Sequence, residues 1–505
     1  MSLNQTMNIS LGSMKNNQYA LTVVSQNIAN MDVEGYSRQR VEFQTNRYTT
    51  KCENVIQTIK GMNGASISAL SSYIDDGILN DLFKTNSDAN YYNTVADGLA
   101  GLEDISDDLG DDGLNALLND FFAASSNLEQ FPTDMTVRNQ YVLALQNVCE
   151  KFNTLSNRYD SFAQDKFNTL QTDTTRVNTL LAQLAVANLS HVSNNQGPAT
   201  QTKISEILTE LSNYTNITTE KNENGTYSVF MGDVAVVEGT QLKYTLQASF
   251  DANAEKPLSM SLKSIENPNL VITQGVTDSF KSGSMRGYVE LLNGSENFTT
   301  LTDLKTSLNS AANSFAQALN DIQTKEDANG FPASIATKDG ELVLEKATTP
   351  VIVSSDGAEI NASNIKVNSL VSKNPYLVAA ARINEDNFVD SDWTKAIGNS
   401  DNATLITALQ NKNICAMGGD ENNCTLSQFL MNTATKTGMD SANIASKAET
   451  YQDIADSSAT NYSNLIGVNL DEELADMIKY QRAYEASAKM FSTINDLMGT
   501  IINMV

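Results

Sequence analysis

Residue types that commonly carry acid–base and metal chemistry are scarce in this chain. His191 is the only histidine among 505 residues. Because histidine is the commonest general base and metal ligand near neutral pH, one histidine cannot form a zinc-binding cluster and leaves little room for a Ser-His-Asp triad. His191 follows a long helical pattern, and we expect it at the surface near a helix end, where a positive charge is favoured.

Motifs with a known catalytic mechanism are also missing from the sequence. It contains no Gly-x-Ser-x-Gly, no Walker loop and no His-Glu-x-x-His. The many Asp and Glu residues could supply a pair of catalytic carboxylates, but no pattern singles out such a pair. The sequence therefore predicts no catalytic residues, no cofactor and no metal site, and we expect the protein not to be an enzyme.

The four cysteines, Cys52, Cys149, Cys415 and Cys424, show no Cys-x-x-Cys spacing, which disfavours a zinc site or thioredoxin-type chemistry. Cys149 lies in an apolar-rich run and is expected to be buried. Cys415 and Cys424 flank a glycine-containing loop. A disulfide could close that loop if the protein works outside the cell, and the sequence alone leaves the disulfide and the free thiols equally open.

The charge balance is strongly acidic, with 33 Lys and Arg against 60 Asp and Glu and a formal net charge of −27. Nucleic acids and anionic membranes both attract clustered positive charge, so we expect neither as a partner. The aspartates between positions 104 and 112 lack the ligand spacing of an EF-hand, and we expect them to precede a helix that begins near Leu114.

Both ends of the chain have apolar side chains at heptad spacing, which predicts two long amphipathic helices with coiled-coil seams. The seam positions that we expect to form the assembly interface are Leu11, Met14, Leu21 and Ile28 near the N-terminus and Leu474, Met477, Tyr484, Phe491 and Met498 near the C-terminus. We expect the two helices to pair with each other. The alternative is that each helix packs on the body of its own subunit.

Between these ends the hydrophobic period alternates between helical and strand-like, which predicts an α+β multidomain protein with inserted β-rich parts. The predicted order is a terminal helix (1–30) that pairs with 464–505, a loop and hairpin connector (31–75), the first half of a helical-bundle body (76–215), a β-rich part (216–295), a helix of the body (296–330), a small β-rich insert (331–373), the second half of the body (374–463) and the C-terminal helix (464–505). We find no signal-peptide pattern and no apolar run of the ~20 residues that span a bilayer, so we expect a cytoplasmic protein or one exported without a cleaved signal.

Two motifs resemble the ends of the flagellar axial proteins, which include rod, hook and hook-associated proteins. The first contains Asn27 and Asn30, followed by Gly35, Tyr36 and Arg38; Asn30 can end the helix and Gly35 permits a turn. The second runs from Gly467 through Asn469 and Leu470 into the helix at 480–489, where Asn469 or Asp471 can cap the helix.

A third stretch, 398–410, resembles the FlgK family, the family of hook-associated protein 1. The helical body that flanks a β-rich part is similar to the same family, whereas a hook protein would have a mostly β middle. The chain departs from the family pattern at 199–203, in the short β insert at 331–372 and in the two cysteines at 415 and 424.

The resemblance implies a structural subunit that forms the junction between hook and filament and permits filament assembly. It implies a ring-like or helical homo-oligomer, contacts with hook protein and hook-associated protein 3, and a cytoplasmic export chaperone bound to the C-terminal helix. It also implies type III export from the cytoplasm to the extracellular flagellum. The alternatives are another flagellar axial protein (hook or distal rod), a secreted adhesin or enzyme with borrowed flagellar ends, or a cytoplasmic coiled-coil scaffold.

Overall fold

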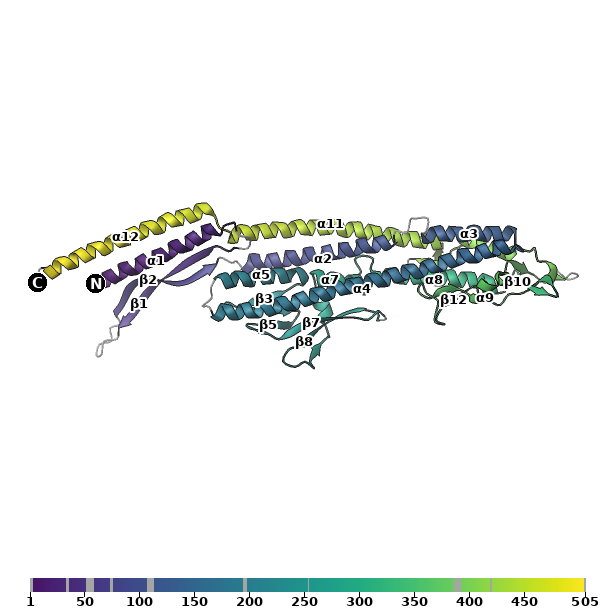
Figure 1. Ribbon diagram of the computed structural model, residues 1–505, viewed down its shortest axis with the longest axis horizontal. Coiled ribbons are helices and arrows are strands. Elements are labelled where there is room, and N and C mark those ends of the chain that lie inside the picture. Colours follow the sequence, from purple (N-terminus) through teal and green to yellow (C-terminus); the bar gives the residue numbers. More distant parts are fainter. Residues whose placement is uncertain are drawn as a thin grey trace.

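The molecule is a long rod with both chain termini at one end (Figure 1). The computed structural model describes residues 3–32, 36–50, 59–72, 76–106, 113–193, 198–252, 254–384, 386, 392–417 and 420–503. Long helices run along the rod, and small antiparallel sheets lie against them. The predicted α+β multidomain class with paired terminal helices is confirmed.

The terminal unit consists of two helices and one hairpin. Its elements are α1 (Leu3–Ala29), β1 (Gln39–Thr50), β2 (Ile59–Ser72) and α12 (Leu470–Asn503). Helix α1 lies between α12 and the hairpin (Figure 1). The hairpin is antiparallel and has two register shifts, which increase the local twist of its strands.

The body is built on helices that run along the rod. They are α2 (Asp76–Ser106), α3 (Leu114–Gln130), α4 (Met135–Ser193), α5 (Pro198–Tyr214), α7 (Ser284–Asn293), α8 (Leu301–Thr324), α10 (Asp401–Ala408) and α11 (Leu426–Ile466). Helix α4 has 59 residues, which gives it a length of about 90 Å at 1.5 Å per residue. This helix sets the length of the body.

Helices α2 and α11 pair antiparallel although they come from opposite ends of the sequence. The rings of Tyr92 and Tyr451 stack with centroids 4.4 Å apart, and the Ser458 hydroxyl donates to Asp81 over 3.1 Å. Helix α11 ends at Gly467, whose N–H donates to the Ser463 carbonyl over 2.8 Å. The chain therefore completes the helical body with α11 and then returns to the terminal unit.

Two sheets cover the C-terminal half of α4. One has the order β3-β4-β5-β6 and the other β7-β8-β9. Their strands are β3 (Thr218–Lys221), β4 (Tyr227–Met231), β5 (Val234–Glu238), β6 (Gln241–Leu242), β7 (Tyr244–Phe250), β8 (Leu258–Ser264) and β9 (Val271–Ile272), followed by the short helix α6 (Val276–Ser279). Their buried apolar residues join the core of the helical body.

These sheets overturn the expectation that His191 lies at the surface. Its side chain is 1% exposed, because the β3–β4 turn folds over the end of α4. The Asn188 side chain holds that turn by donating to the Tyr227 carbonyl over 2.8 Å. A Cβ at Gly225 (φ +78°) would lie only 2.7 Å from His191 Nε2, so the turn needs glycine there both for space and for its left-handed backbone.

The end of the rod opposite the termini carries small sheets and short helices. The sheets are β11-β10-β14, β12-β13 and β15-β16. The elements are β10 (Phe331–Lys338), β11 (Glu341–Lys346), β12 (Ile352–Ser354), β13 (Ile365–Val367), α9 (Ser369–Lys373), η1 (Pro375–Leu377), β14 (Ala381–Ile383), η3 (Trp393–Lys395), η4 (Leu409–Asn411), β15 (Cys415–Met417) and β16 (Asp420–Cys424). Strand β14 extends the β10 sheet from beyond residue 373, where the expected insert ends.

A buried arginine connects this end to α4. Arg138 is 1% exposed, and its guanidinium donates to the carbonyls of Pro132 (2.6 Å), Pro375 (3.0 Å) and Val378 (2.8 Å). Burial lowers the pKa of Arg138 to about 10. No carboxylate of the described residues contacts this cation, and the three carbonyls satisfy it instead. Arg138 therefore attaches η1 to the start of the long helix.

Candidate assembly site at the paired terminal helices

Helices α1 and α12 pair antiparallel through two polar contacts. The hydroxyls of Ser13 and Ser487 lie 2.9 Å apart, and the Asn27 side chain donates to Glu473 over 3.0 Å. The two contacts are two heptads apart on both helices, as a coiled-coil seam requires. The pairing therefore runs in a single register over at least these two heptads.

The side chains that α1 buries lie one position before the predicted stripe. The buried positions that share the heptad frame of these contacts are Ser10, Ala20, Val24 and Asn27. Leu11 is 39% exposed, and Met14, Leu21 and Ile28 are only half-buried. Small and polar residues allow two helices to approach closely, so hydrophobicity alone points to the wrong face of α1 for contact with α12.

On α12 two lines of positions at heptad spacing are at least partly buried, and one of them contains four of the five predicted positions. Met477, Tyr484, Phe491 and Met498 are half-buried, whereas Leu474 is 42% exposed. The second line, which sequence reasoning missed, is Glu473, Tyr480, Ser487 and Ile494. Both Glu473 and Ile494 are buried. Glu473 and Ser487 give no hydrophobic signal. Both precede Ile494 by a multiple of seven residues, and this heptad spacing could have identified them.

Helix α1 also packs on the β1–β2 hairpin. Ala20 and Val23 form a small core with Val41, against which Tyr480 of α12 also packs. The Asn16 side chain donates to the Ala65 carbonyl over 2.7 Å. The hairpin and α12 therefore hold α1 between them.

Asn27 is the centre of a polar cluster at the base of the two helices. Its side-chain NH₂ donates to the Gln39 carbonyl over 2.9 Å and to Glu473 over 3.0 Å. Its side-chain oxygen accepts from the Tyr36 hydroxyl and from the Gln39 N–H, both over 3.0 Å. All four hydrogen-bonding positions of this buried amide are filled, so the cluster specifies asparagine.

Arg38 completes this cluster, which we call the polar lock (Asn27, Tyr36, Arg38, Glu472 and Glu473). The Nε of its guanidinium donates to Glu473 over 2.6 Å, and the NH1 of the same group contacts Glu472. The backbone N–H of Arg38 donates to the Ile466 carbonyl over 2.8 Å. Burial lowers the pKa of Arg38, but the carboxylates of Glu472 and Glu473 outweigh burial and raise it overall. Burial also raises the pKa of Tyr36. The polar lock thus joins α1, the end of α11 and the start of α12.

The remaining motif positions shape the chain around the polar lock. Asn30 donates from its side chain to the Gln26 carbonyl over 2.8 Å at the end of α1. Asn469 accepts from the Asp471 N–H over 3.0 Å and so caps α12. Gly467 ends α11, and Leu470 begins α12 with 40% of its surface exposed. Gly35 lies outside the described residues.

The paired helices leave large apolar side chains exposed. On α12 they form two stripes at helical spacing, a first stripe of Leu470, Leu474 and Ile478 and a second stripe of Met490, Leu497 and Ile501. On α1, Leu11 and Tyr19 are exposed as well. Exposed apolar stripes of this kind are a surface that a binding partner can cover.

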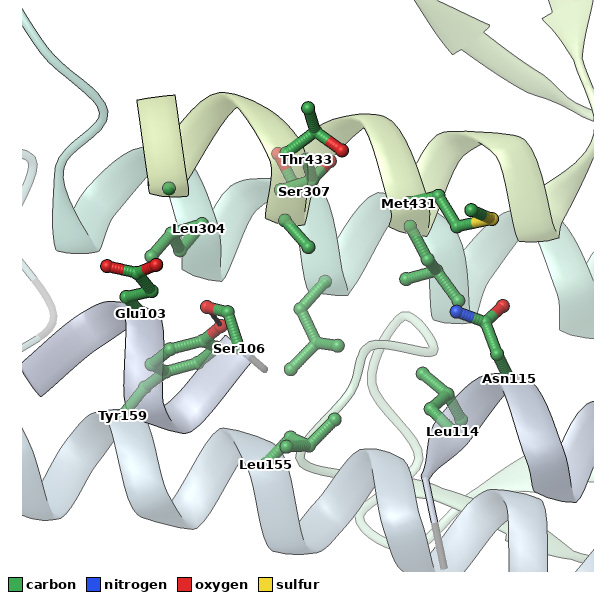
Figure 2. A pocket seen from close by; sticks show the side chains of 15 residues that line it. Glu103, Ser106, Leu114, Asn115, Leu155, Tyr159, Leu304, Ser307, Met431 and Thr433 are labelled. Carbon is green, nitrogen blue, oxygen red and sulfur yellow. Dashed lines mark hydrogen bonds between the residues drawn. The ribbon is translucent and has the colours of Figure 1, made fainter. Parts of the chain in front are cut away.

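A mainly apolar cavity between the helices of the body gives no competing active site. Its volume is about 360 Å³, and it lies where α2, α3, α4, α8 and α11 meet (Figure 2). Leucines dominate its wall, and the hydroxyls of Ser106 and Tyr159 lie 2.9 Å apart at its edge. Among the described residues that line it, Glu103 is the only acidic one. Within the described ranges, no group of three or more His, Cys, Asp or Glu residues could hold a metal ion.

No described helix combines the length and the hydrophobicity needed to cross a membrane.

Comparison with known proteins gives a consistent result along the chain. Residues 99–334 match the family "Flagellar hook-associated protein FlgK helical domain". Residues 7–36 match "Flagella basal body rod protein", and residues 460–504 match "Flagellar basal body rod FlgEFG protein C-terminal". The two terminal matches cover most of α1, all of α12 and most of the polar lock.

Full-length relatives agree with these matches. The chain is 24% identical to flagellar hook-associated protein 1 of Bacillus subtilis, over 96% of this chain and 95% of the relative. It is 20% identical to the protein of the same name from Salmonella typhimurium, over 99% and 100% of the two chains. The solved structure of the hook junction protein FlgK from Burkholderia pseudomallei has the same fold, with a TM-score of 0.59 and 13% identity over 76% of this chain and 99% of that one.

Proposed function

Because the chain belongs to the FlgK family of flagellar hook-associated proteins, we propose that it is a structural subunit of the junction between hook and filament and permits filament assembly. The observation that carries the proposal is the exposed apolar surface on the paired terminal helices. Neighbouring subunits would cover the two stripes of α12 and the apolar positions of α1.

In this proposal the pairing of α1 and α12 within one subunit is separate from the contact between subunits. Small and polar side chains pair the two helices, and the polar lock fixes their direction relative to the body. The predicted interface residues Leu11, Met14, Leu21, Ile28 and Leu474 then remain wholly or partly available to neighbours. Moving one such side chain from full exposure to full burial contributes about 1.5–3 kcal/mol. Each partly exposed side chain contributes a fraction of this, so many repeated copies together can hold a ring-like or helical assembly.

The chain assembles with other components of the bacterial flagellum, as its family does. We propose hook protein and hook-associated protein 3 as its neighbours, and an extracellular position after type III export from the cytoplasm. Before export, the apolar stripes of α12 would be exposed to aggregation. We therefore propose that a cytoplasmic export chaperone covers α12. We also propose that the chain has no catalytic activity, since the cavity described above has no converging titratable groups.

Deleting residues 464–505 tests the proposal by imaging flagella on cells that carry only the truncated chain. We expect hooks without filaments and filament protein released into the medium. Loss of the hook itself would instead indicate a hook or rod protein. Normal filaments would refute the assembly role and favour an adhesin or enzyme.

A further inference from the structure

We propose that Cys415 and Cys424 form a cross-strand disulfide under oxidising conditions, which makes the β15–β16 hairpin a modification site. The proposal goes beyond the junction role and does not depend on it. It rests on the register of the hairpin, on the surroundings of the two sulfur atoms and on the position of the hairpin before α11.

The hairpin register places the two cysteines directly opposite each other. Opposed residues of an antiparallel pair have Cα atoms about 4.5 or 5.5 Å apart, depending on the hydrogen-bonding position, and both values lie within the range that disulfides span. The Cys424 thiol already points at its partner strand, since its Sγ lies 3.5 Å from the Cys415 carbonyl oxygen. The backbone register therefore suits a disulfide, and the bond forms once the two side chains turn toward each other.

Both thiols are buried in the main core of the body. Cys415 is 2% exposed and Cys424 is 7% exposed, and β15 packs against α8 and α11. Cys149 is buried elsewhere, in the first half of α4, and Cys52 lies outside the described residues. A metal ion would need further ligands, and none of the described His, Cys, Asp or Glu residues completes a group of three. The pair is thus suited to bond with itself.

The reaction is a thiol–disulfide exchange with a small-molecule disulfide such as oxidised glutathione. One thiolate attacks the oxidant and releases one thiol, and the second cysteine then displaces the other. One Sγ–Sγ bond forms, the disulfide bond of the oxidant breaks, and the oxidant leaves as two thiols that carry the two hydrogens. Burial raises the pKa of Cys415 to about 11 and raises that of Cys424, so exchange is slow in the folded protein and faster while the chain folds.

The bond would fix the start of α11. Thr425 follows Cys424 directly and forms a capping box with Gln428: the Thr425 hydroxyl accepts from the Gln428 N–H and the Gln428 side chain accepts from the Thr425 N–H. Closing a loop of about ten residues lowers the entropy of the open hairpin enough to shift its opening equilibrium about a hundredfold. Reducing conditions such as those of the cytoplasm would keep the hairpin open to unfolding.

The test uses the full chain refolded with oxidised and reduced glutathione at mildly alkaline pH, followed by denaturation, alkylation of free thiols and mass spectrometry. Trypsin cuts after Lys412 and Lys436, so both cysteines share one peptide. We expect this peptide to lack the mass of two hydrogens and to resist alkylation until it is reduced. Cleavage at Glu421 should then give two fragments joined by the disulfide.

Two variants control the assignment. The double variant Cys52→Ser/Cys149→Ser removes the other cysteines and should leave the modified peptide unchanged. Cys415→Ser should abolish the modification and leave an alkylated Cys424. Amide exchange in β15, β16 and the first turn of α11 should be up to about a hundredfold slower in the oxidised protein than in the reduced one. Full alkylation of both cysteines after oxidative refolding, or a bond from either one to Cys52, would overturn the proposal.

Discussion

Removing the guanidinium of Arg38 should release the terminal unit from the body. The side chains of Arg38 and Glu473 are 14% and 2% exposed, whereas that of Glu472 is 59% exposed. Breaking a buried ion pair by removing one partner costs about 3–5 kcal/mol, and a solvent-exposed pair contributes about 0–1 kcal/mol. Because Asn27 still donates to Glu473, we expect the Arg38→Ala cost at the lower end, about 3 kcal/mol.

Hydrogen exchange measured by mass spectrometry on the full chain is the appropriate assay, because the terminal unit can open without the body unfolding. A loss of about 3 kcal/mol should accelerate exchange in α1 and in the first turns of α12 by about two orders of magnitude. Arg482→Ala is the matched control, because Arg482 is an exposed arginine on α12. This variant should change the exchange rates little.

A double variant distinguishes a buried pair from general damage. Arg38→Met with Glu473→Leu removes both charges and should recover much of the protection that Arg38→Ala loses, since no uncompensated charge remains. If Arg38→Ala and Arg482→Ala exchange alike, the polar lock does not hold the terminal unit and the reasoning is refuted.

Two further predictions concern the body. Arg138→Met should make the region around η1 and β14 sensitive to limited proteolysis, because three buried carbonyls lose their donor at about 1–3 kcal/mol each. The same change at half-exposed Arg158 should have little effect on proteolysis. Equal resistance of the two variants to the protease would refute the role given to Arg138. Burial raises the pKa of Asp173 above 3.8, so this carboxyl favours folding at low pH and loses that contribution as pH rises through its folded pKa. Asp173→Asn should therefore raise the thermal midpoint near neutral pH and lose this advantage near pH 3.8. A thermal midpoint equal to that of the unchanged protein at both pH values would contradict this prediction.

Heptad spacing at the two ends was enough to predict that the terminal helices pair, because that pattern depends only on local sequence. It did not identify which face of α1 meets α12. The structure places Ser10, Ser13 and Asn27 at that contact, while the more apolar neighbours Leu11 and Ile28 lie one position away. Hydrophobic patterns mark what a helix must eventually bury, and in an assembling subunit that surface need not face its own chain.

Only some residues of the polar lock could be predicted from the sequence. Asn27, Tyr36 and Arg38 could be singled out by resemblance, but their partner Glu473 belongs to an acidic first turn of a helix, which is common for electrostatic reasons alone. The burial of His191 could not be predicted for a similar reason. It depends on the β3–β4 turn at Gly225, which is far from His191 in the sequence. Contacts between segments far apart in sequence leave no local pattern to detect.

The most direct test of the account is to make the exposed stripes of α12 polar without disturbing the fold. The variant Leu474→Ser/Ile478→Ser/Met490→Ser/Leu497→Ser should keep the wild-type hydrogen exchange of the isolated chain, because these side chains are 42–53% exposed. Cells that carry it should form hooks without filaments and release filament protein. A variant with serine at exposed Met431 and Met439 of α11 should assemble normally. Normal filaments on cells with the α12 variant would contradict the claim that this surface binds neighbouring subunits.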